Sequence, residues 1–177
     1  MSEVTAKSRI RISFLMVGIS LIALVVTYAS ITIATAWRAQ KEVPRLAADS
    51  LVKALRTYHQ QAGTFPASFR ELETRVWKHK QPPDFGADGR SLSVANYYYI
   101  YHPIDAKTCT IWIVPTGPRR EEGSTHFLLL TPQGLRRWKG VPLSLDEVKN
   151  LPSIPQYREM VVLGMTEQQP IDLGRKK

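Results

Sequence analysis

The chain contains an uninterrupted run of 26 residues, 12–37, without a single Asp, Glu, Lys, Arg or His. At a rise of about 1.5 Å per residue, a helix of this length reaches about 39 Å. The hydrocarbon core of a bilayer is about 30 Å thick. The run is therefore long enough to cross a membrane as a tilted helix, and we expect a transmembrane helix at 12–37 behind a basic arm at 1–11.

A cleaved signal peptide is the alternative interpretation of this segment. Such peptides place positive charge before an apolar stretch of about 7–15 residues that ends in small residues. Basic residues between 7 and 11 precede the run, and Ala34 and Ala36 near its end offer a weak cleavage pattern. Because the run is far longer than a signal peptide needs, its length favours a retained anchor.

Residues at the two ends of the run suit a membrane surface. Arg11 precedes the run, and Trp37 and Arg38 close it. An indole ring prefers the headgroup level, and a guanidinium group extends from there into water. We expect these three residues to mark the membrane interfaces. The numbers of basic residues before and after the run are nearly equal, so they do not decide the orientation. We expect the usual orientation of an anchor that follows a short basic leader. The N-terminus is then cytoplasmic and the soluble part periplasmic, in a bacterial inner membrane.

A second helix is expected after the run, because apolar residues recur there at the spacing of one helical face. The stripe consists of Ala48, Leu51, Val52, Leu55 and Tyr58. Gly63 suits the end of this helix. Ser68 and Glu71 have the spacing of a capping box, which predicts a short helix, and Ser144 and Glu147 predict another.

Three segments have the aromatic and β-branched composition of strands and are separated by turn residues, at 96–102, 108–114 and 125–131. Alternation within the second segment places Cys109, Ile111 and Ile113 on one face. We expect an antiparallel meander with four inward positions, Ile111, Ile113, Phe127 and Leu129. The stretch 80–91, rich in Pro and Gly, is expected to be a loop, and 135–139 a turn or short strand.

The sequence points to no cofactor and no enzymatic activity. The run 12–37 offers no side chain for an ion path, a proton relay or a haem ligand. The single Cys109 excludes an internal disulfide and a multi-cysteine metal site, and its apolar neighbours predict a small buried side chain. The histidines fit no ligand motif and lie far apart, at His59, His79, His102 and His126. No nucleophile elbow, P-loop or dinucleotide-binding glycine pattern occurs in the sequence.

The order of these features resembles the type IV pilin family, particularly the pseudopilins of type II secretion. An apolar helix, a helix ending near Tyr58, the turn Gly63-Thr-Phe65-Pro66 and then Leu72 follow one another as in that family. The resemblance implies an α+β fold, in which a long N-terminal helix continues into an amphipathic helix packed on a small antiparallel meander. The expected organisation is a basic arm at 1–11, a transmembrane helix at 12–37, a soluble pilin-like α+β domain at 38–157 and a C-terminal tail at 158–177.

The chain departs from the pilin pattern where pilins are processed. Pilins are similar in having a Gly before the processing site and a Glu five residues into the apolar segment, whereas here Gly18 lies inside a run without Glu. Two non-enzymatic functions remain. One is an accessory subunit of a larger membrane complex, such as a respiratory or photosynthetic assembly. The other is a pseudopilin-like component of a type II secretion or type IV pilus machine. The missing Glu and processing site favour the first.

The basic composition indicates which partners to expect. Twenty-four Lys and Arg against 15 Asp and Glu give a net charge of +9, which attracts anionic lipids, acidic proteins or nucleic acid. Attachment to a membrane favours the lipid bilayer, other membrane subunits and an acidic soluble protein over nucleic acid. Because the charges are scattered, a merely solvated surface remains the alternative.

A cluster of arginines around one tryptophan is the candidate partner interface. It consists of Arg119, Arg120, Arg136, Arg137 and Trp138. Tryptophan and arginine are enriched at interfaces, because the ring fills a pocket while guanidinium groups pair with carboxylates. The alternative is that Trp138 packs into the core of its own domain.

The first prediction concerns the anchor. Because the uncharged run is longer than a signal peptide needs, we expect the mature protein to keep residues 1–36. Intact mass spectrometry of the protein purified from membranes measures this directly. A mass that lacks the leader through Ala36 would contradict the prediction.

Overall fold

The computed structural model describes residues 47–78, 83–118 and 120–168. The expected arm at 1–11 and the expected transmembrane helix at 12–37 lie outside these residues. Among the described residues, no helix is both long enough and apolar enough to cross a membrane. The described part has an α+β fold built on one antiparallel sheet of seven strands, which confirms the predicted α+β class.

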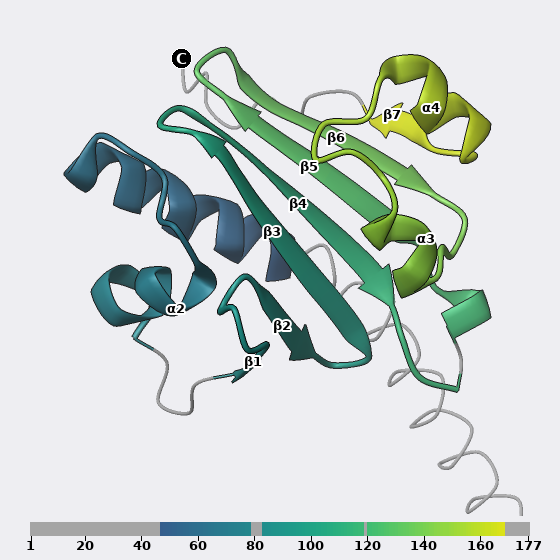
Figure 1. Ribbon diagram of the computed structural model, residues 1–177, viewed down its shortest axis with the longest axis horizontal. Coiled ribbons are helices and arrows are strands. Elements are labelled where there is room, and N and C mark those ends of the chain that lie inside the picture. The colour runs from purple at the N-terminus through teal and green to yellow at the C-terminus, as the bar shows by residue number, and fades with distance from the viewer. Residues whose placement is uncertain (1–46, 79–82, 119, 169–177) are drawn as a thin grey trace, which may run out of the picture. The chain divides into compact units, whose positions relative to one another are not determined.

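The sheet is a meander in which each strand pairs with the next one along the chain (Figure 1). Its strands are β1 (Asp84–Phe85), β2 (Ser91–Val94), β3 (Tyr97–Asp105), β4 (Thr108–Pro115), β5 (Thr125–Thr131), β6 (Gly134–Gly140) and β7 (Thr166–Gln168). Antiparallel neighbours need only a short turn between them. The three strands expected from composition are confirmed as β3, β4 and β5.

The stretch 80–91, expected to be a loop, instead contributes to two strands. Asp84–Phe85 forms β1, and Ser91 begins β2. The turn between them is closed by a hydrogen bond of 2.9 Å from the Gly86 N–H to the Ser91 carbonyl. Gly89 adopts a positive φ of 65° in this turn, a conformation that glycine adopts without steric cost. The glycines therefore mark a hairpin here rather than an irregular loop.

Regular structure continues in the C-terminal part of the chain. The segment 135–139 lies entirely within β6, so of the two expected forms, turn or short strand, it is the strand. Of the expected tail at 158–177, residues 158–168 supply most of α4 (Tyr157–Val162) and all of β7, which pairs antiparallel with β6. A three-residue strand carries little sequence signal of its own, because its pairing with β6 depends on tertiary contacts.

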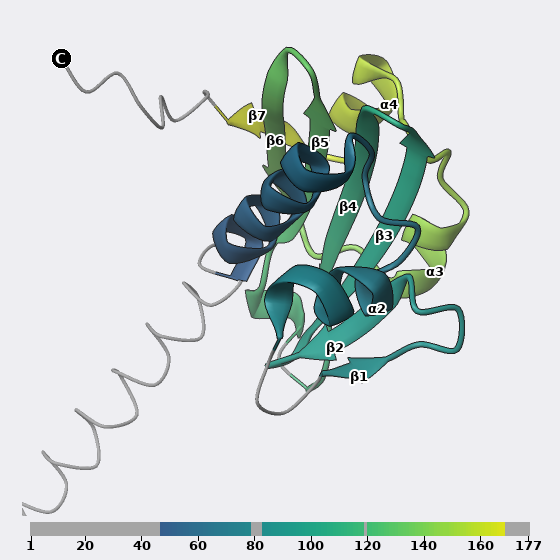
Figure 2. The same cartoon turned by 90° about the vertical axis from the view of Figure 1, so that its left-hand side faces the viewer.

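Helices cover both faces of the sheet. Helix 47–62 and α2 (Phe69–Leu72), followed by the π-helical turn η1 (Glu73–Trp77), lie on one face. On the opposite face lie α3 (Leu145–Lys149) and α4, as the two perpendicular views show (Figures 1 and 2). The capping box predicted for α3 is confirmed, with Ser144 and Glu147 satisfying each other's backbone N–H groups.

The first core lies between helix 47–62, α2 and the sheet. All five residues of the predicted helical stripe are buried in it, so the amphipathic prediction is confirmed. The stripe packs against one face of β3 and β4, which supplies Tyr99, Tyr101, Cys109, Ile111 and Ile113. Gly63 ends the helix with a φ of 74° and donates its N–H to the His59 carbonyl, as expected for a C-terminal glycine.

The second core lies on the other face of the sheet, beneath α3 and α4. Its centre is a row of three aromatic rings, with centroids 4.6 Å apart for Trp112 and Phe127 and 5.3 Å apart for Phe127 and Trp138. In the register, Trp112 pairs with Phe127. Phe127 and the half-buried Leu129 therefore point inward as predicted, but into a different core from Ile111 and Ile113.

The turn after helix 47–62 is fastened to the sheet by hydrogen bonds. The buried Tyr101 hydroxyl donates to the Pro66 carbonyl at 2.7 Å, and the Phe65 N–H donates to the Ala106 carbonyl at 3.2 Å. Ser68 caps α2 by accepting from the Glu71 N–H at 3.2 Å. These contacts fix the helix at one position across the strands.

The Glu71 carboxylate also contributes to this attachment, but its hydrogen bonds differ from those that a capping box predicts. It accepts hydrogen bonds from the Tyr58 hydroxyl and from the Ala67 N–H. These two donors, Tyr58 foremost, lower the pKa of Glu71 below its usual range. Glu71 thus ties α2 to the end of helix 47–62.

The second prediction tests the first core. Ile113 is fully buried on β4, and replacing it with Ala should lower the free energy of unfolding by about 2–5 kcal/mol, since the lost contacts leave a cavity. The control is Ile104→Ala, because Ile104 is 38% exposed on β3 and should matter little. Tryptophan fluorescence during thermal unfolding gives the melting temperatures of the wild type and both variants, which test the prediction. Equal melting temperatures would mean that Ile113 does not face a packed core.

Candidate interaction surface

Those residues of the predicted partner interface that the structure describes do not form one surface. Arg119 lies outside the described residues. Arg120 is exposed in the short turn η2 (Arg120–Glu122) and pairs with the adjacent Glu121 at 2.9 Å. Trp138 is only 4% exposed and belongs to the second core, which agrees with the core alternative for this residue.

The two arginines beside Trp138 point to opposite faces of β6. The Arg136 guanidinium lies 4.7 Å from the centroid of the Trp138 ring and forms two hydrogen bonds to Glu167 of β7, at 2.7 and 2.9 Å. Arg137 instead pairs with Asp49 of helix 47–62 on the other face. Both arginines therefore bind parts of their own domain. Arg137 connects the helix to the sheet, and Arg136 connects the last strand to the second core.

Two buried threonines attach the C-terminal segment to the sheet. The Thr110 hydroxyl donates to the Ser153 carbonyl at 2.9 Å, and the Thr125 hydroxyl accepts from the Leu143 N–H at 2.7 Å. Leu143, together with Val148, Met160 and Met165, then packs into the second core. Polar groups inside an apolar layer favour one arrangement, because any other would leave them without partners.

The outer side of this attached segment exposes apolar residues. Among the described residues, six large hydrophobic side chains are exposed, and five of them fall within 141–162. We call these five the C-terminal apolar surface: Val141, Ile154, Tyr157, Val161 and Val162. Tyr157 is 65% and Val162 is 81% exposed. Single exposed apolar residues are common, whereas five within one short segment make that segment a candidate contact site.

The apolar residues of α4 fall into one buried and several exposed side chains. Met160 is buried, whereas Tyr157, Val161 and Val162 are exposed. Val141 lies next to Gly164, the second residue after the helix, because a side chain at Gly164 would come within 3.6 Å of it. The sequence signal for this surface is the apolar run 160–163, which is too long for the inward face of so short a helix.

A second feature is a basic cavity of about 400 Å³ beside the C-terminal end of helix 47–62. Arg56 and Lys107 line it together with His59, and Phe65 and Leu130 form apolar walls. The His59 ring stacks against Phe65 with centroids 4.8 Å apart. Two exposed positive charges beside an apolar wall suit a carboxylate carried on an apolar or aromatic group.

The remaining candidate groups are enclosed in the domain. Cys109 is fully buried, and burial raises the pKa of its thiol to about 12. Burial lowers the pKa of His126 to about 4, with smaller contributions from Lys139 and Arg137. Within the described ranges, no group of three or more His, Cys, Asp or Glu side chains is arranged to hold a metal ion. His79 lies outside those ranges.

Comparisons with models of protein families, with curated proteins and with solved structures found no match to this chain.

The third prediction follows from the partly buried His126. Between pH 6.5 and about 4 its unfolded imidazole binds a proton that the folded one does not, so stability is full above pH 6.5 and falls as the pH drops to about 4. This residue alone should contribute up to about 3 kcal/mol of that loss. His126→Gln should flatten the curve of unfolding free energy against pH in this window.

The variant Lys139→Gln separates the causes of this effect. Burial is the largest cause of the shifted pKa of His126, and the charge of Lys139 is a smaller one. We therefore expect Lys139→Gln to keep most of the slope between pH 4 and 6.5. Loss of the whole slope in this variant, or an unchanged slope in His126→Gln, would contradict the assignment.

Proposed function

We propose that the protein is a single-pass, membrane-anchored accessory subunit of a larger membrane complex, in which it has no catalytic role of its own. The uncharged run 12–37 supplies the anchor. The seven-stranded domain docks on a partner and stabilises the assembly. A respiratory or photosynthetic complex of a bacterial inner membrane is the candidate host, with the domain on the periplasmic side.

The C-terminal apolar surface is the observation that carries this proposal. Its five side chains are presented by a segment that capping boxes and buried threonines hold in place. A fixed apolar surface binds with less loss of conformational freedom than a mobile one. Exposed apolar groups of this kind support a protein contact, because covering them removes apolar area from water.

The charge of the chain supports an acidic partner. The basic cavity with Arg56 and Lys107 offers a separate contact for a carboxylate. Net charge of +9 would also raise the rate of encounter with an acidic protein. In this proposal the apolar surface provides affinity, and the basic groups provide steering.

A pseudopilin-like component of a secretion or pilus machine is the second candidate. It is supported by the lengthwise packing of helix 47–62 on an antiparallel meander, with the turn 63–66 held against β3 and the β3–β4 turn. The missing Glu and processing Gly weigh against it. A pilin-like fold retained as a permanently anchored module is compatible with both candidates.

The fourth prediction tests the docking surface. In the full-length protein, Val161→Glu combined with Val162→Glu places charge on the apolar surface, and burying that charge in an interface is costly. We expect at least about a tenfold drop in the partner subunits that co-purify from membranes in mild detergent. Blue native electrophoresis should show the host complex without this subunit.

The control for this experiment is Ile104→Glu. Ile104 is an exposed large hydrophobic residue outside the C-terminal apolar surface, so its complex should remain intact. Both variants should keep the wild-type melting temperature, because none of the three positions is buried. Unchanged co-purification in the double variant would overturn the proposal. Recovery of secretion or pilus components with the wild type would favour the second candidate.

A further inference from the structure

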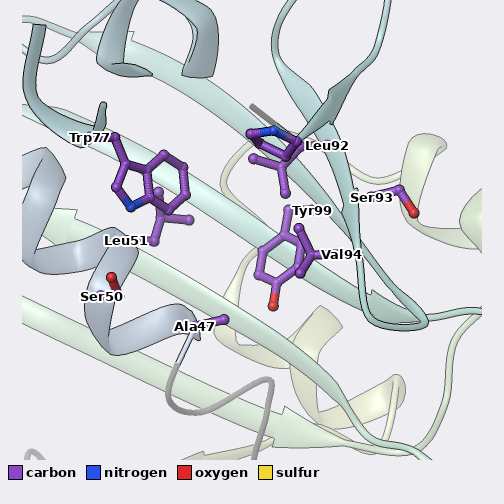
Figure 3. A pocket seen from close by; sticks show the side chains of 9 residues that line it. Ala47, Ser50, Leu51, Trp77, Leu92, Ser93, Val94 and Tyr99 are labelled. Carbon is purple, nitrogen blue, oxygen red and sulfur yellow. The ribbon is translucent and has the colours of Figure 1, made fainter. Parts of the chain in front are cut away.

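An apolar cavity of about 360 Å³ lies beside the beginning of the described part of helix 47–62. The helix contributes Ala47, Ser50 and Leu51, while Trp77 of η1, Leu92 of β2 and Tyr99 of β3 face it (Figure 3). None of the described residues that line the cavity is charged. A cavity of about 150 Å³ already accommodates benzene, and ligand sites begin near 300 Å³.

The hydroxyl of Tyr99 is the unusual group beside this cavity. Tyr99 is 2% exposed, and its oxygen is buried without a hydrogen-bond partner among the described residues. In Figure 3 the hydroxyl is directed toward the side of the cavity where Ala47 lies. Other tyrosines nearby have partners: Tyr98 donates to the Ser91 hydroxyl at 2.8 Å and Tyr101 to the Pro66 carbonyl.

A buried polar group normally has a partner, because it would otherwise lose its bonds to water without replacement. Burial raises the pKa of Tyr99 above its ordinary value, so the hydroxyl stays protonated at neutral pH and can donate. What the hydroxyl proton lacks is therefore an acceptor. A neutral acceptor fits best, since the described residues that line the cavity include no cation to offset the desolvation of an anion.

We propose that this cavity binds a neutral, lipophilic molecule whose carbonyl oxygen accepts a hydrogen bond from the Tyr99 hydroxyl. The apolar walls from Leu51, Leu92 and Trp77 bind the hydrocarbon part of the molecule. The single donor fixes its orientation. Apolar walls with one or a few placed polar groups are the usual composition of small-molecule sites.

The bilayer supplies two molecules of this chemistry, the acyl esters of lipids and quinones. This choice of source rests on the proposed membrane anchor. Ala47 follows Trp37 by ten residues, so at most about 36 Å of chain separates the cavity wall from the expected membrane interface. The binding site itself does not depend on the anchor.

Two small soluble probes test the site in the full-length protein at a fixed detergent concentration. Acetophenone carries a carbonyl group, whereas ethylbenzene has the same ring and nearly the same size without one. We expect both to bind the wild type saturably in ligand-observed NMR. Tyr99→Phe should lower the affinity for acetophenone by about 3- to 10-fold and leave the affinity for ethylbenzene unchanged.

Matched variants make the result specific to this cavity. Tyr98→Phe removes a hydroxyl on the opposite face of β3 and should change the affinity for neither probe. Ala47→Phe should lower the affinity for both probes, because the larger side chain occupies the cavity. Tyr99→Phe should not lower the melting temperature, since the hydroxyl it removes has no partner, whereas Tyr101→Phe should lower it. Equal acetophenone affinity in wild type and Tyr99→Phe, or no saturable binding, would overturn the proposal.

Native mass spectrometry of the protein purified from its own membranes distinguishes the two sources. A retained lipid mass or a retained quinone mass that disappears in Ala47→Phe identifies the occupant. A retained mass that persists in Ala47→Phe would exclude that molecule from the cavity. Binding of the soluble probes requires neither the membrane nor the partner complex. Failure here therefore leaves the docking proposal intact, and failure of docking leaves this site intact.

Discussion

The architecture depends on the burial of β4 on both of its faces. Every residue of this strand after Thr108 is buried, so neither face of the sheet can remain in water. Helix 47–62 covers Cys109, Ile111 and Ile113, and the C-terminal segment covers Trp112 and Val114. A strand that is apolar on both faces requires two layers. The second layer is supplied by α3 and α4, which lie in the chain between β6 and β7.

Local patterns predicted the parts of the fold whose signal lies within a few residues. The stripe of helix 47–62, its terminal Gly63 and the capping box of α3 were all identified from spacing. The second core was missed because alternation separates the faces of a strand without showing whether the outer face is covered. Phe127 and Leu129 were accordingly grouped with Ile111 and Ile113, although the register places them opposite Trp112 and Thr110.

The same alternation explains the outcome at the candidate interface. Adjacent residues in a strand point to opposite faces, so Arg137 had to diverge from Arg136 and Trp138 once 135–139 formed a strand. Arg137 then pairs with Asp49, and Trp138 joins the aromatic row with Phe127. Three of the five apolar residues that face outward lie in the short helix α4, of which the sequence marked only the apolar run that begins at 160. The sequence does not distinguish Tyr99 from its neighbours, because only the fold shows which tyrosine hydroxyl lacks a hydrogen-bond partner.

The way in which the second layer is attached connects the fold to its proposed function. Helices as short as α3 and α4 are not stable in water by themselves and depend on tertiary contacts. Thr110 and Thr125 add hydrogen bonds to the backbone of the segment, at sites that are fully buried. Each of these bonds can form only when the segment occupies one position over the strands. The outward side chains Tyr157, Val161 and Val162 are thereby presented in one arrangement, which a flexible tail of the same composition would not provide.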